Sequence, residues 1–395
     1  MPQQLGLDLN CVLKAYHQAD CQVTNDQLYR TAVAQAGVDP GHLSTRAKVG
    51  RSGEQHNLLK RKIRWYQQTA RALGFIERVP GKRGVWRMTQ AGRDKLTIAP
   101  PNVSLVAFST ELGVALWSTW ENVFPRLEER IDLVLTSPPY ALRAPRRYGN
   151  PTAEQYVDFI CKALEPLVAN LSDGGIITLN ISNDIFEKGS PARSLYRERL
   201  VIALHDRLQL FKLDELVWVN TSKPPSPYQW SSRTRQQLNC GYEPVYVFTN
   251  NPAAARSDNR RVLQPHTDQH QRLIDRGGEA KARSSSDGAY RIKPGSYGNA
   301  TAGKIPRNVI TMGHRCADQV KVKRAAREAG LPVHGAAMPL QLASFLVQYL
   351  SRPGDLVADP FAGTLTTAKA AEINGRRWIA TDSALEYLLA GSSRF

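Results

Sequence analysis

The feature that most constrains the fold is an alternation of short apolar runs with helical stretches across residues 101–250. These runs are nearly continuous in apolar residues, which is typical of strands buried on both faces of a sheet. Strands of this kind separated by helices predict a mainly parallel sheet in a doubly wound α/β fold. The runs are Ile131–Leu135, Ile176–Asn180, Leu216–Val219 and Val245–Phe248.

The same pattern resumes near the C-terminus. A predicted helix carrying Leu342 to Leu350 precedes a strand at Leu356–Ala358, and a Gly/Thr turn and a further helix lead to a strand at Trp378–Ala380. Residues 251–330 interrupt the pattern with Arg, Ser, Gly, Asn and His and with few long apolar runs. We therefore predict four parts: residues 1–100, a first half of the α/β pattern at 101–250, an irregular and partly mobile basic insertion at 251–330, and a second half of the pattern at 331–395.

Positive charge is concentrated in two of these parts. The 395 residues hold 52 Lys and Arg against 35 Asp and Glu, a net charge of +17. Residues 1–100 and residues 251–330 each hold 16 basic and 7 acidic side chains, a net of +9, and the remainder is nearly neutral. Solvated basic surfaces would explain one such cluster, but two of them beside a neutral body favour a polyanionic partner, and nucleic acid is the commonest.

The first hundred residues predict three helices followed by a hairpin. Thr24 or Asn25 is placed to cap the second helix, and the third runs from about Asn57 to Leu73 with several basic side chains. The hairpin turns at Pro80–Gly84. This order resembles a winged helix-turn-helix, which implies that the third helix enters the major groove and the hairpin contacts the backbone. The alternative is a small helical cap used for dimer contact.

A rigid turn follows the first strong strand, with the sequence T-S-P-P-Y at Thr136–Tyr140. A residue that precedes proline is held extended, and neither proline has an N–H donor, so the turn presents carbonyl oxygens and the Ser137 hydroxyl. Tyr140 adds a flat ring at the carboxyl edge of the sheet, where ligands bind in open α/β folds. Fixed acceptors beside an aromatic plane suit a flat ring that carries an exocyclic NH2 group.

Methylation of such an amino group is a problem of positioning. The nitrogen lone pair is delocalised into the base, and acceptors on its hydrogens can draw the nitrogen toward tetrahedral geometry and aim the lone pair at a methyl donor. The base must first leave the duplex stack. Taken alone, the motif is equally compatible with a Pro-Pro loop that only ends a strand.

A second motif resolves this ambiguity. Asp355–Thr367 reads as a strand, a turn of small residues and a helix start, and Asp382 ends the next strand 23 residues after Asp359. An acid at this spacing is the Rossmann arrangement for binding ribose hydroxyls, while a G-x-G-x-x-G phosphate loop is absent from the sequence. A ribose-bearing cofactor without a critical pyrophosphate points to S-adenosylmethionine.

Together the two motifs, S-P-P-Y and D-P-F-A-G-T-L-T-T, resemble the DNA amino-methyltransferases. The catalytic motif precedes the cofactor motif, as in the beta group, so the resemblance implies a Rossmann-like methyltransferase fold with circularly permuted motif order and a target-recognition region between the motifs. It covers about residues 101–395 and extends through Tyr148–Asn150, Asp173–Gly175, Pro191–Tyr196, Trp218–Pro227 and His334–Leu340. The stretch is most similar to restriction–modification enzymes that methylate cytosine N4, where serine commonly heads the motif. Adenine N6 remains the alternative.

The resemblance also implies roles for individual residues. The flipped base would be held and stacked by Ser137, Pro138, Pro139 and Tyr140. The cofactor would be lined by Asp359, Phe361, Ala362, Gly363, Thr364 and Thr366, held by Asp382 at the ribose, and covered by His334, Met338 and Pro339. Leu365 departs from the family, which usually has glycine there, and its side chain would either narrow the cofactor pocket or point into the sheet.

The sequence therefore predicts a sequence-specific, S-adenosylmethionine-dependent methyltransferase acting on double-stranded DNA. The candidate DNA-binding residues are Lys60, Arg61, Arg64, Lys82, Arg83, Arg260, Arg261, Arg291, Lys293, Lys304 and Arg307. A non-enzymatic DNA-binding regulator and an RNA amino-methyltransferase are the alternatives. The family makes a homodimer and a companion restriction endonuclease expected partners.

Cysteine usage and hydropathy bear on compartment and on other classes of site. Five scattered cysteines, never in C-x-x-C spacing, argue against a disulfide framework and a zinc site and fit a reducing cytoplasm. The resemblance to DNA methyltransferases implies a bacterial or phage protein that is associated with the nucleoid. The apolar runs are far shorter than the ~20 residues that a membrane helix needs. We expect neither a metal nor a membrane partner.

Overall fold

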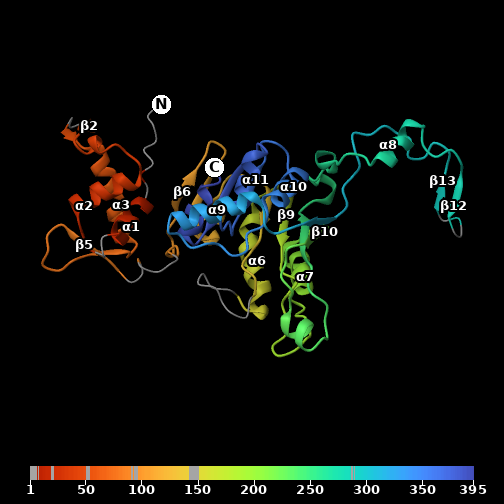
Figure 1. Ribbon diagram of the computed structural model, residues 1–395, viewed down its shortest axis with the longest axis horizontal. Coiled ribbons are helices and arrows are strands. Elements are labelled where there is room, and N and C mark those ends of the chain that lie inside the picture. Colours follow the sequence, from red (N-terminus) through yellow and green to blue (C-terminus); the bar gives the residue numbers. More distant parts are fainter. Residues whose placement is uncertain are drawn as a thin grey trace.

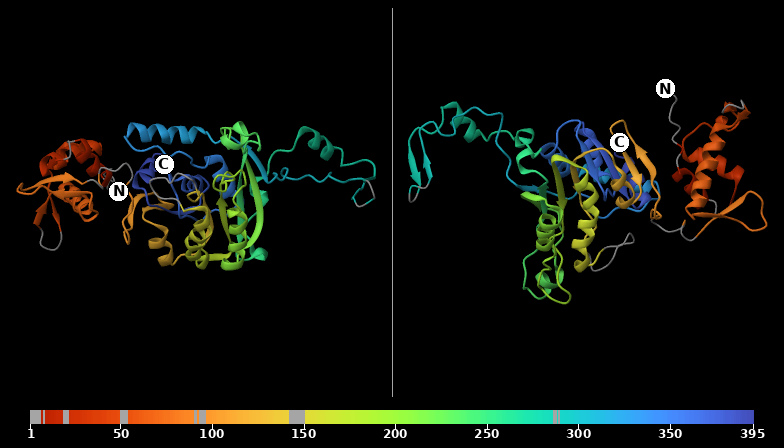
Figure 2. Two further views of the ribbon diagram at one scale, coloured as in Figure 1. Left: turned by 90° about the horizontal axis from the view of Figure 1, so that it is seen from below. Right: turned by 180° about the vertical axis from the view of Figure 1, so that it is seen from behind.

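The protein has three parts along its longest axis (Figure 1). The computed structural model describes residues 7, 9–18, 22–49, 54–89, 92, 97–141, 151–285, 288 and 290–395. An N-terminal module lies at one end, a large α/β body lies in the middle, and an extended arm projects from the other end, and the two further views agree on this arrangement (Figure 2). Cys21 and Tyr148–Asn150, on which predictions fell, lie outside the described residues.

The body is built on a nine-stranded sheet in the order β14-β10-β11-β9-β8-β15-β16-β7-β6. Its five central strands are parallel, as predicted. Strand β11 runs antiparallel between β9 and β10, and β6 is antiparallel to β7. The strands of the body are β6 (Leu105–Ser109), β7 (Gly113–Trp117), β8 (Ile131–Thr136), β9 (Leu171–Asn180), β10 (Phe211–Asn220), β11 (Tyr242–Thr249), β14 (Val309–Met312), β15 (Leu356–Asp359) and β16 (Arg377–Asp382).

Helices cover both faces of this sheet, which explains why its central strands are apolar throughout. All six residues of β8 are buried, with Leu133 in the core on one face and Val134 in the core on the other. Helices α10 and α11 pack on the first face, and α6 and α7 on the second. The helices of the body are α5 (Trp120–Val123), α6 (Ala153–Ala169), α7 (Tyr196–Leu208), α9 (Ala317–Glu328), α10 (Leu340–Leu350), α11 (Thr366–Ile373) and α12 (Leu385–Ser392).

In its described residues the N-terminal module contains the helices α1, α2 and α3 and a three-stranded antiparallel sheet in the order β1-β5-β4. Thr24 caps the second helix in a capping box, as the sequence predicts. Asn57, where the third helix was predicted to begin, caps that helix. A short hairpin not predicted from the sequence, β2–β3, lies between these two helices. The elements are α1 (Leu9–Gln18), β1 (Gln22–Thr24), α2 (Asn25–Gln35), β2 (Ala47–Val49), β3 (Glu54–His56), α3 (Leu58–Ala72), β4 (Ile76–Arg78) and β5 (Val85–Met88).

One buried tryptophan joins this module to the body. Trp117, at the end of β7, contacts Phe75 of the module with ring centroids 5.8 Å apart. Its indole N–H also lies within hydrogen-bonding distance of the carbonyl oxygens of Thr97 and Ser383, at 3.2 and 2.8 Å. The hydrophobic core is therefore continuous from the module into the sheet.

The projecting segment, residues 263–307, is named the basic arm here. It contains α8 (Asp268–Asp275) and the hairpin of β12 (Arg283–Ser285) and β13 (Tyr290–Ile292). Beyond it the chain returns as β14, which pairs in parallel with β10, and as α9. The stretch predicted to be irregular over 251–330 therefore includes one strand of the main sheet. β14 is a short edge strand whose four residues alternate between exposed and partly buried, which explains its weak apolar signal.

Ion pairs anchor the start of this segment at the edge where the parallel strands begin. Arg256 pairs with Asp132 at 3.0 Å, near the start of β8, and with Asp355 at 3.1 Å, just before β15.

In the described part of the chain, no helix combines the length and apolarity required to cross a membrane.

Candidate active site

The two sequence motifs meet because their strands are neighbours. β8 and β15 pair in parallel, so the turns that follow them leave the same edge of the sheet. The Thr136 hydroxyl donates to Asp359 Oδ1 at 2.6 Å, and the Thr367 hydroxyl donates to the Leu135 carbonyl at 3.2 Å. These two bonds join residues more than 220 positions apart and fix the S-P-P-Y turn against the cofactor motif.

The tyrosine of the S-P-P-Y turn is held by its hydroxyl. The Tyr140 Oη lies 3.2 Å from Ser137 Oγ, 3.2 Å from Asn180 Oδ1 and 3.1 Å from Glu243 Oε2. Burial, with the nearby Glu243 carboxylate, raises the pKa of Tyr140 well above its ordinary value, so its hydroxyl stays protonated. The ring is thereby fixed at the carboxyl ends of β8 and β9.

Asp382 organises the turn after β15 through its two carboxylate oxygens. The Gly363 N–H donates to Oδ2 at 2.7 Å, and the Ala384 N–H donates to Oδ1 at 2.8 Å. Gly363 has a φ of +49°, in the left-handed region that favours glycine. Burial raises the pKa of both Asp382 and Asp359 to about 6. A ligand that donates hydroxyl groups to Asp382 would favour its ionised form.

A cleft of about 830 Å³ opens over both motifs. All four predicted catalytic residues line it, as do four of the predicted cofactor residues. The lining residues predicted from the sequence are Ser137, Pro138, Pro139, Tyr140, His334, Phe361, Gly363 and Asp382. Its volume lies within the range of roughly 300–1,000 Å³ that is typical of ligand pockets.

The remaining walls of the cleft were not predicted from the sequence. One is the segment Ser118–Glu121, which follows β7 and lies beside Asp382 because the Ser118 N–H donates to the Asp382 carbonyl at 3.1 Å. The other is α6, where Phe159 contacts Phe361 with ring centroids 5.6 Å apart. Only the position of β7 next to β16 brings the first wall to the site, and a sequence without a known strand order carries no such signal.

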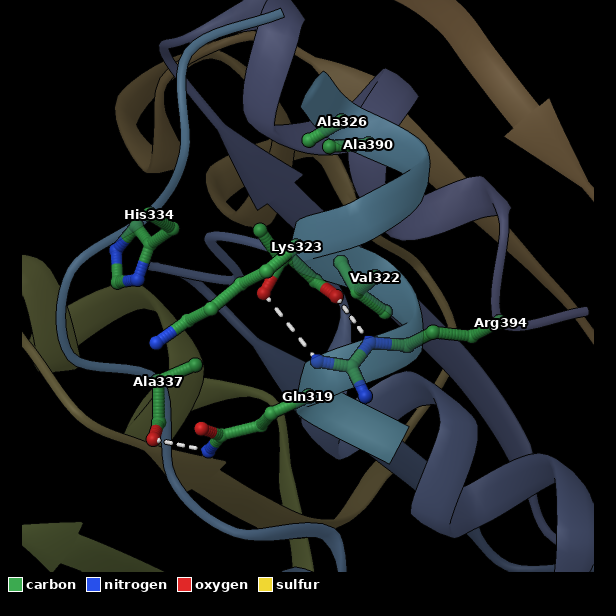
Figure 3. Close-up of a pocket in the computed structure, with 9 residues that line it drawn as sticks. Gln319, Val322, Lys323, Ala326, His334, Ala337, Ala390 and Arg394 are labelled. Atoms are coloured by element: carbon green, nitrogen blue, oxygen red, sulfur yellow. Dashed lines mark hydrogen bonds between the residues drawn. The ribbon is translucent and has the colours of Figure 1, made fainter. Parts of the chain in front are cut away.

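The other predicted cofactor residues lie behind the cleft and do not line it. Asp359, Ala362 and Thr366 are buried, and Thr364 lines a small separate pocket. Gln319, Val322 and Lys323 of α9 line the same pocket (Figure 3). In that pocket the Gln319 side chain donates to the carbonyls of Ala337 and Met338, which fixes the segment that also carries Pro339. Direct contact of these predicted residues with a cofactor stays a prediction.

A buried arginine supports the cofactor turn from below. Arg394 donates to the Thr364 carbonyl at 2.6 Å and to the Thr366 hydroxyl at 3.1 Å, and it forms an ion pair with Asp318 of α9. Burial lowers the pKa of Arg394 to about 10, so it remains charged at neutral pH. The turn is therefore tied to both α9 and the C-terminal segment, where no sequence motif indicated a role.

The predicted DNA-binding residues are distributed over the two ends of the molecule. Arg291, Lys293, Lys304 and Arg307 are exposed on the basic arm, and Lys82 and Arg83 are exposed at the β4–β5 turn. Arg64 donates to the Tyr29 hydroxyl at 2.5 Å, and Lys60 lies over the same ring. Arg260 is exposed beside Asp258, to which it donates.

Arg261 is used differently. Its guanidinium donates to the carbonyls of Arg256, Tyr349 and Ser351, and burial lowers its pKa. These bonds favour a structural role at the base of the arm, and a contact between Arg261 and DNA stays a prediction. No group of three or more His, Cys, Asp or Glu side chains within the described ranges is arranged to hold a metal ion.

The comparison with known proteins adds the family. A family model described as DNA methylase matches residues 131–391. The chain belongs to the DNA methylase family. The type II methyltransferase M.PvuII of Proteus hauseri is 30% identical over 268 residues, which cover 68% of this chain and 79% of that protein. The orphan methyltransferase M.BamHII of Bacillus amyloliquefaciens is 44% identical over 54 residues, 14% of this chain and 20% of that one.

A solved structure agrees with this assignment. The structure described as PvuII DNA methyltransferase (cytosine-N4-specific) superposes with a TM-score of 0.58 and 26% identity, covering 73% of this chain and 88% of that one. The predicted α/β fold and the DNA amino-methyltransferase family are thereby confirmed. The family model begins at residue 131, so it does not include the N-terminal module.

Leu365 occupies a backbone conformation that favours glycine. Its φ is +60°, it is fully buried, and it is absent from the lining of the cleft. Its side chain instead faces α12, where a Cβ added at Gly391 would lie 3.0 Å from Leu365 Cγ. The departure from the family pattern therefore affects backbone strain and core packing, and it does not narrow the described cleft.

This position should reverse the usual order of alanine and glycine. Replacing leucine removes buried contacts worth about 2–5 kcal/mol, whereas glycine relieves left-handed strain of about 1–2 kcal/mol. We expect Leu365→Gly to be more stable than Leu365→Ala by about 1 kcal/mol in urea denaturation.

Leu346, buried in the middle of α10, provides the control. There Leu346→Ala should be more stable than Leu346→Gly by about 1 kcal/mol, because glycine is unfavourable inside a helix. The same order at both positions would contradict the assignment of strain to Leu365.

Proposed function

We propose that the protein transfers a methyl group from S-adenosylmethionine to the exocyclic amino group of a base flipped out of double-stranded DNA, with cytosine N4 as the target. The observation that carries this proposal is the cleft shared by the S-P-P-Y turn and the cofactor motif. The choice of cytosine is supported by Ser137 at the head of the turn and by the similarity to a cytosine-N4-specific enzyme. Adenine N6 is the alternative within the same family.

The residues of the cleft suit the cofactor. Asp382 would accept from the ribose hydroxyls, Phe361 and Trp120 offer apolar surface for the adenine, and the small residue Gly363 allows close approach of the backbone. His334 lies beside this turn, with its ring 4.7 Å from that of Tyr387. S-adenosylmethionine, when bound, supplies an electrophilic methyl group.

The chain's own residues would position the amino group. Ser137 Oγ and the Pro138 carbonyl accept from its two N–H bonds, while the Tyr140 ring stacks on the base. These contacts aim the nitrogen lone pair without a covalent intermediate between enzyme and base. Water is excluded as the base fills the space above Tyr140.

We propose that the N-terminal module is a winged helix. Its order of helices and strands, and the pairing of β1 with β5 of the hairpin, support this.

Because strands β8 to β11 precede β15 and β16 in the sequence, we also propose the circularly permuted arrangement of the beta group. The module and the basic arm lie at opposite ends of the body, so together they would contact DNA on both sides of the target (Figure 1). A homodimer, a companion endonuclease and a cytoplasmic location belong to the same proposal.

Product analysis tests the function. Incubation with the cofactor and mixed-sequence duplex DNA should yield N4-methylcytosine on nucleoside digestion and mass spectrometry. Ser137→Ala should lower kcat by about 10²-fold or more while cofactor binding is retained. N6-methyladenine as the product would move the target base, and methylation of RNA alone, or of no nucleic acid, would overturn the proposal.

The N-terminal hairpin should contribute to the salt dependence of DNA binding. Each phosphate contact adds about 0.9 to the slope of log affinity against log salt concentration. Lys82→Gln combined with Arg83→Gln should therefore reduce that slope by about 1–2 in fluorescence anisotropy titrations. Arg126→Gln, at an exposed position before β8 begins, is the control. An unchanged slope in the double variant would show that these charges only face solvent.

A further inference from the structure

A carboxylate that belongs to neither sequence motif lies directly behind the S-P-P-Y turn. Glu243 is the second residue of β11, and because β11 runs antiparallel to β9 its start reaches the same edge of the sheet as the catalytic turn. Its side chain is only 15% exposed. Glu243 Oε2 is 3.1 Å from the Tyr140 hydroxyl, which is itself 3.2 Å from Ser137 Oγ.

The hydrogen-bonding capacity of these groups sets a direction. A carboxylate only accepts, and it is a stronger acceptor than the neutral amide oxygen of Asn180, which also lies 3.2 Å from the Tyr140 hydroxyl. The proton of Tyr140 is then directed to Glu243, so the Tyr140 oxygen is left to accept from Ser137. Ser137 in turn directs its proton away from the cleft and its lone pairs toward it.

This direction matters for the proposed reaction. An amino group can donate to Ser137 only if Ser137 Oγ presents a lone pair to it. With a protonated Glu243, the order of donors could reverse and the Ser137 proton would point at the amino group. The ionised carboxylate also places negative potential near the nitrogen, where positive charge develops as the methyl group is transferred.

We propose that Glu243 is a positioning residue for methyl transfer, which fixes the direction of the hydroxyl chain Ser137–Tyr140–Glu243 so that Ser137 accepts from the target amino group. The proposal rests on the proposed function. Glu243 does not touch the substrate, and it acts only through Tyr140.

The surroundings of Glu243 determine how its charge depends on pH. Lys223 Nζ lies 3.9 Å from Glu243 Oε1, and the side chains of Asp184 and Tyr196 also interact electrostatically with the carboxylate. Burial is the largest influence and raises the pKa of Glu243, although Lys223 and hydrogen bonds from Tyr140 and Asn180 oppose it. The carboxylate therefore becomes protonated at a higher pH than an exposed glutamate, and the rate should fall as pH decreases through that raised pKa.

The test is the pH dependence of kcat for the full-length protein at saturating cofactor and DNA. Saturation separates the effect of Glu243 ionisation on the rate from the effect of Asp382 ionisation on cofactor binding. Wild type should lose rate on the acid side. Glu243→Gln, which keeps the shape but not the charge, should lower kcat about tenfold at pH 8 and lose that acid limb, with cofactor affinity unchanged. Glu243→Asp should restore part of the rate and the limb.

Tyr140→Phe interrupts the same chain by removing its middle hydroxyl and keeps the Glu243 carboxylate in place. It should give a similar loss and the same loss of the acid limb, and the double variant should be no slower than either single variant, because both remove one chain. Should Glu243→Gln not fold, Tyr140→Phe decides the matter alone. Glu111→Gln, at an exposed position in the β6–β7 turn, is the control for removal of a carboxylate.

Parallel pH profiles in wild type and both variants, or losses that multiply in the double variant, would overturn the role of Glu243. A wild-type protein that methylates no DNA would instead refute the proposed function, so the two failures are distinguishable.

Discussion

The structure depends on one contact between two neighbouring strands, the hydrogen bond from the Thr136 hydroxyl to Asp359. Parallel pairing of β8 with β15 brings the two strand ends to one edge, and this hydrogen bond, 2.6 Å between the two oxygens, fixes one strand end against the other. Both side chains are buried, so water does not compete for this hydrogen bond. A base held by one turn and a cofactor held by the other can meet only because these turns share an edge. A displacement of the hydrogen-bond acceptors by about 1 Å would greatly lower the rate of methyl transfer.

The charge of the molecule follows the same division. Residues 1–100 and residues 251–330 each carry a net charge of +9, and the rest of the chain is nearly neutral because its basic and acidic side chains are almost equal in number. The first share lies in the N-terminal module at one end of the molecule, whereas the second is divided between the basic arm at the other end and the segment of α9 in the body (Figures 1 and 2). Arg256 and Arg261 fix the start of the segment that leads into the basic arm, because Arg256 pairs with carboxylates and Arg261 donates to backbone carbonyls of the body. The exposed basic side chains of the arm follow these two residues in the sequence. In the proposed function, affinity for DNA and chemistry on the base therefore belong to separate surfaces.

The sequence alone predicted the parallel α/β body, both motifs, the cap at Thr24 and the start of the third helix near Asn57, because each rests on local pattern: continuous apolar runs, Pro-Pro rigidity, small residues in a turn. It did not predict the wall at Ser118–Glu121, Arg394 or Glu243, because their importance comes from strand order and from contacts across hundreds of residues. The position of Met338 and Pro339 behind the cleft is likewise set by Gln319 of a distant helix. Leu365 shows the reverse case, since its motif position was evident but its direction required the backbone angle.

The central claim is that one cleft holds the target amino group and the methyl donor together. Its most direct test is a crystal structure of the full-length protein with a non-reactive analogue of S-adenosylmethionine and an unmethylated duplex that contains the target site. We predict an extrahelical base stacked on Tyr140, with its amino nitrogen within hydrogen-bonding distance of Ser137 Oγ and the Pro138 carbonyl and with the analogue against Asp382. A target base that remains stacked in the duplex, or an analogue bound away from Asp382, would contradict the account.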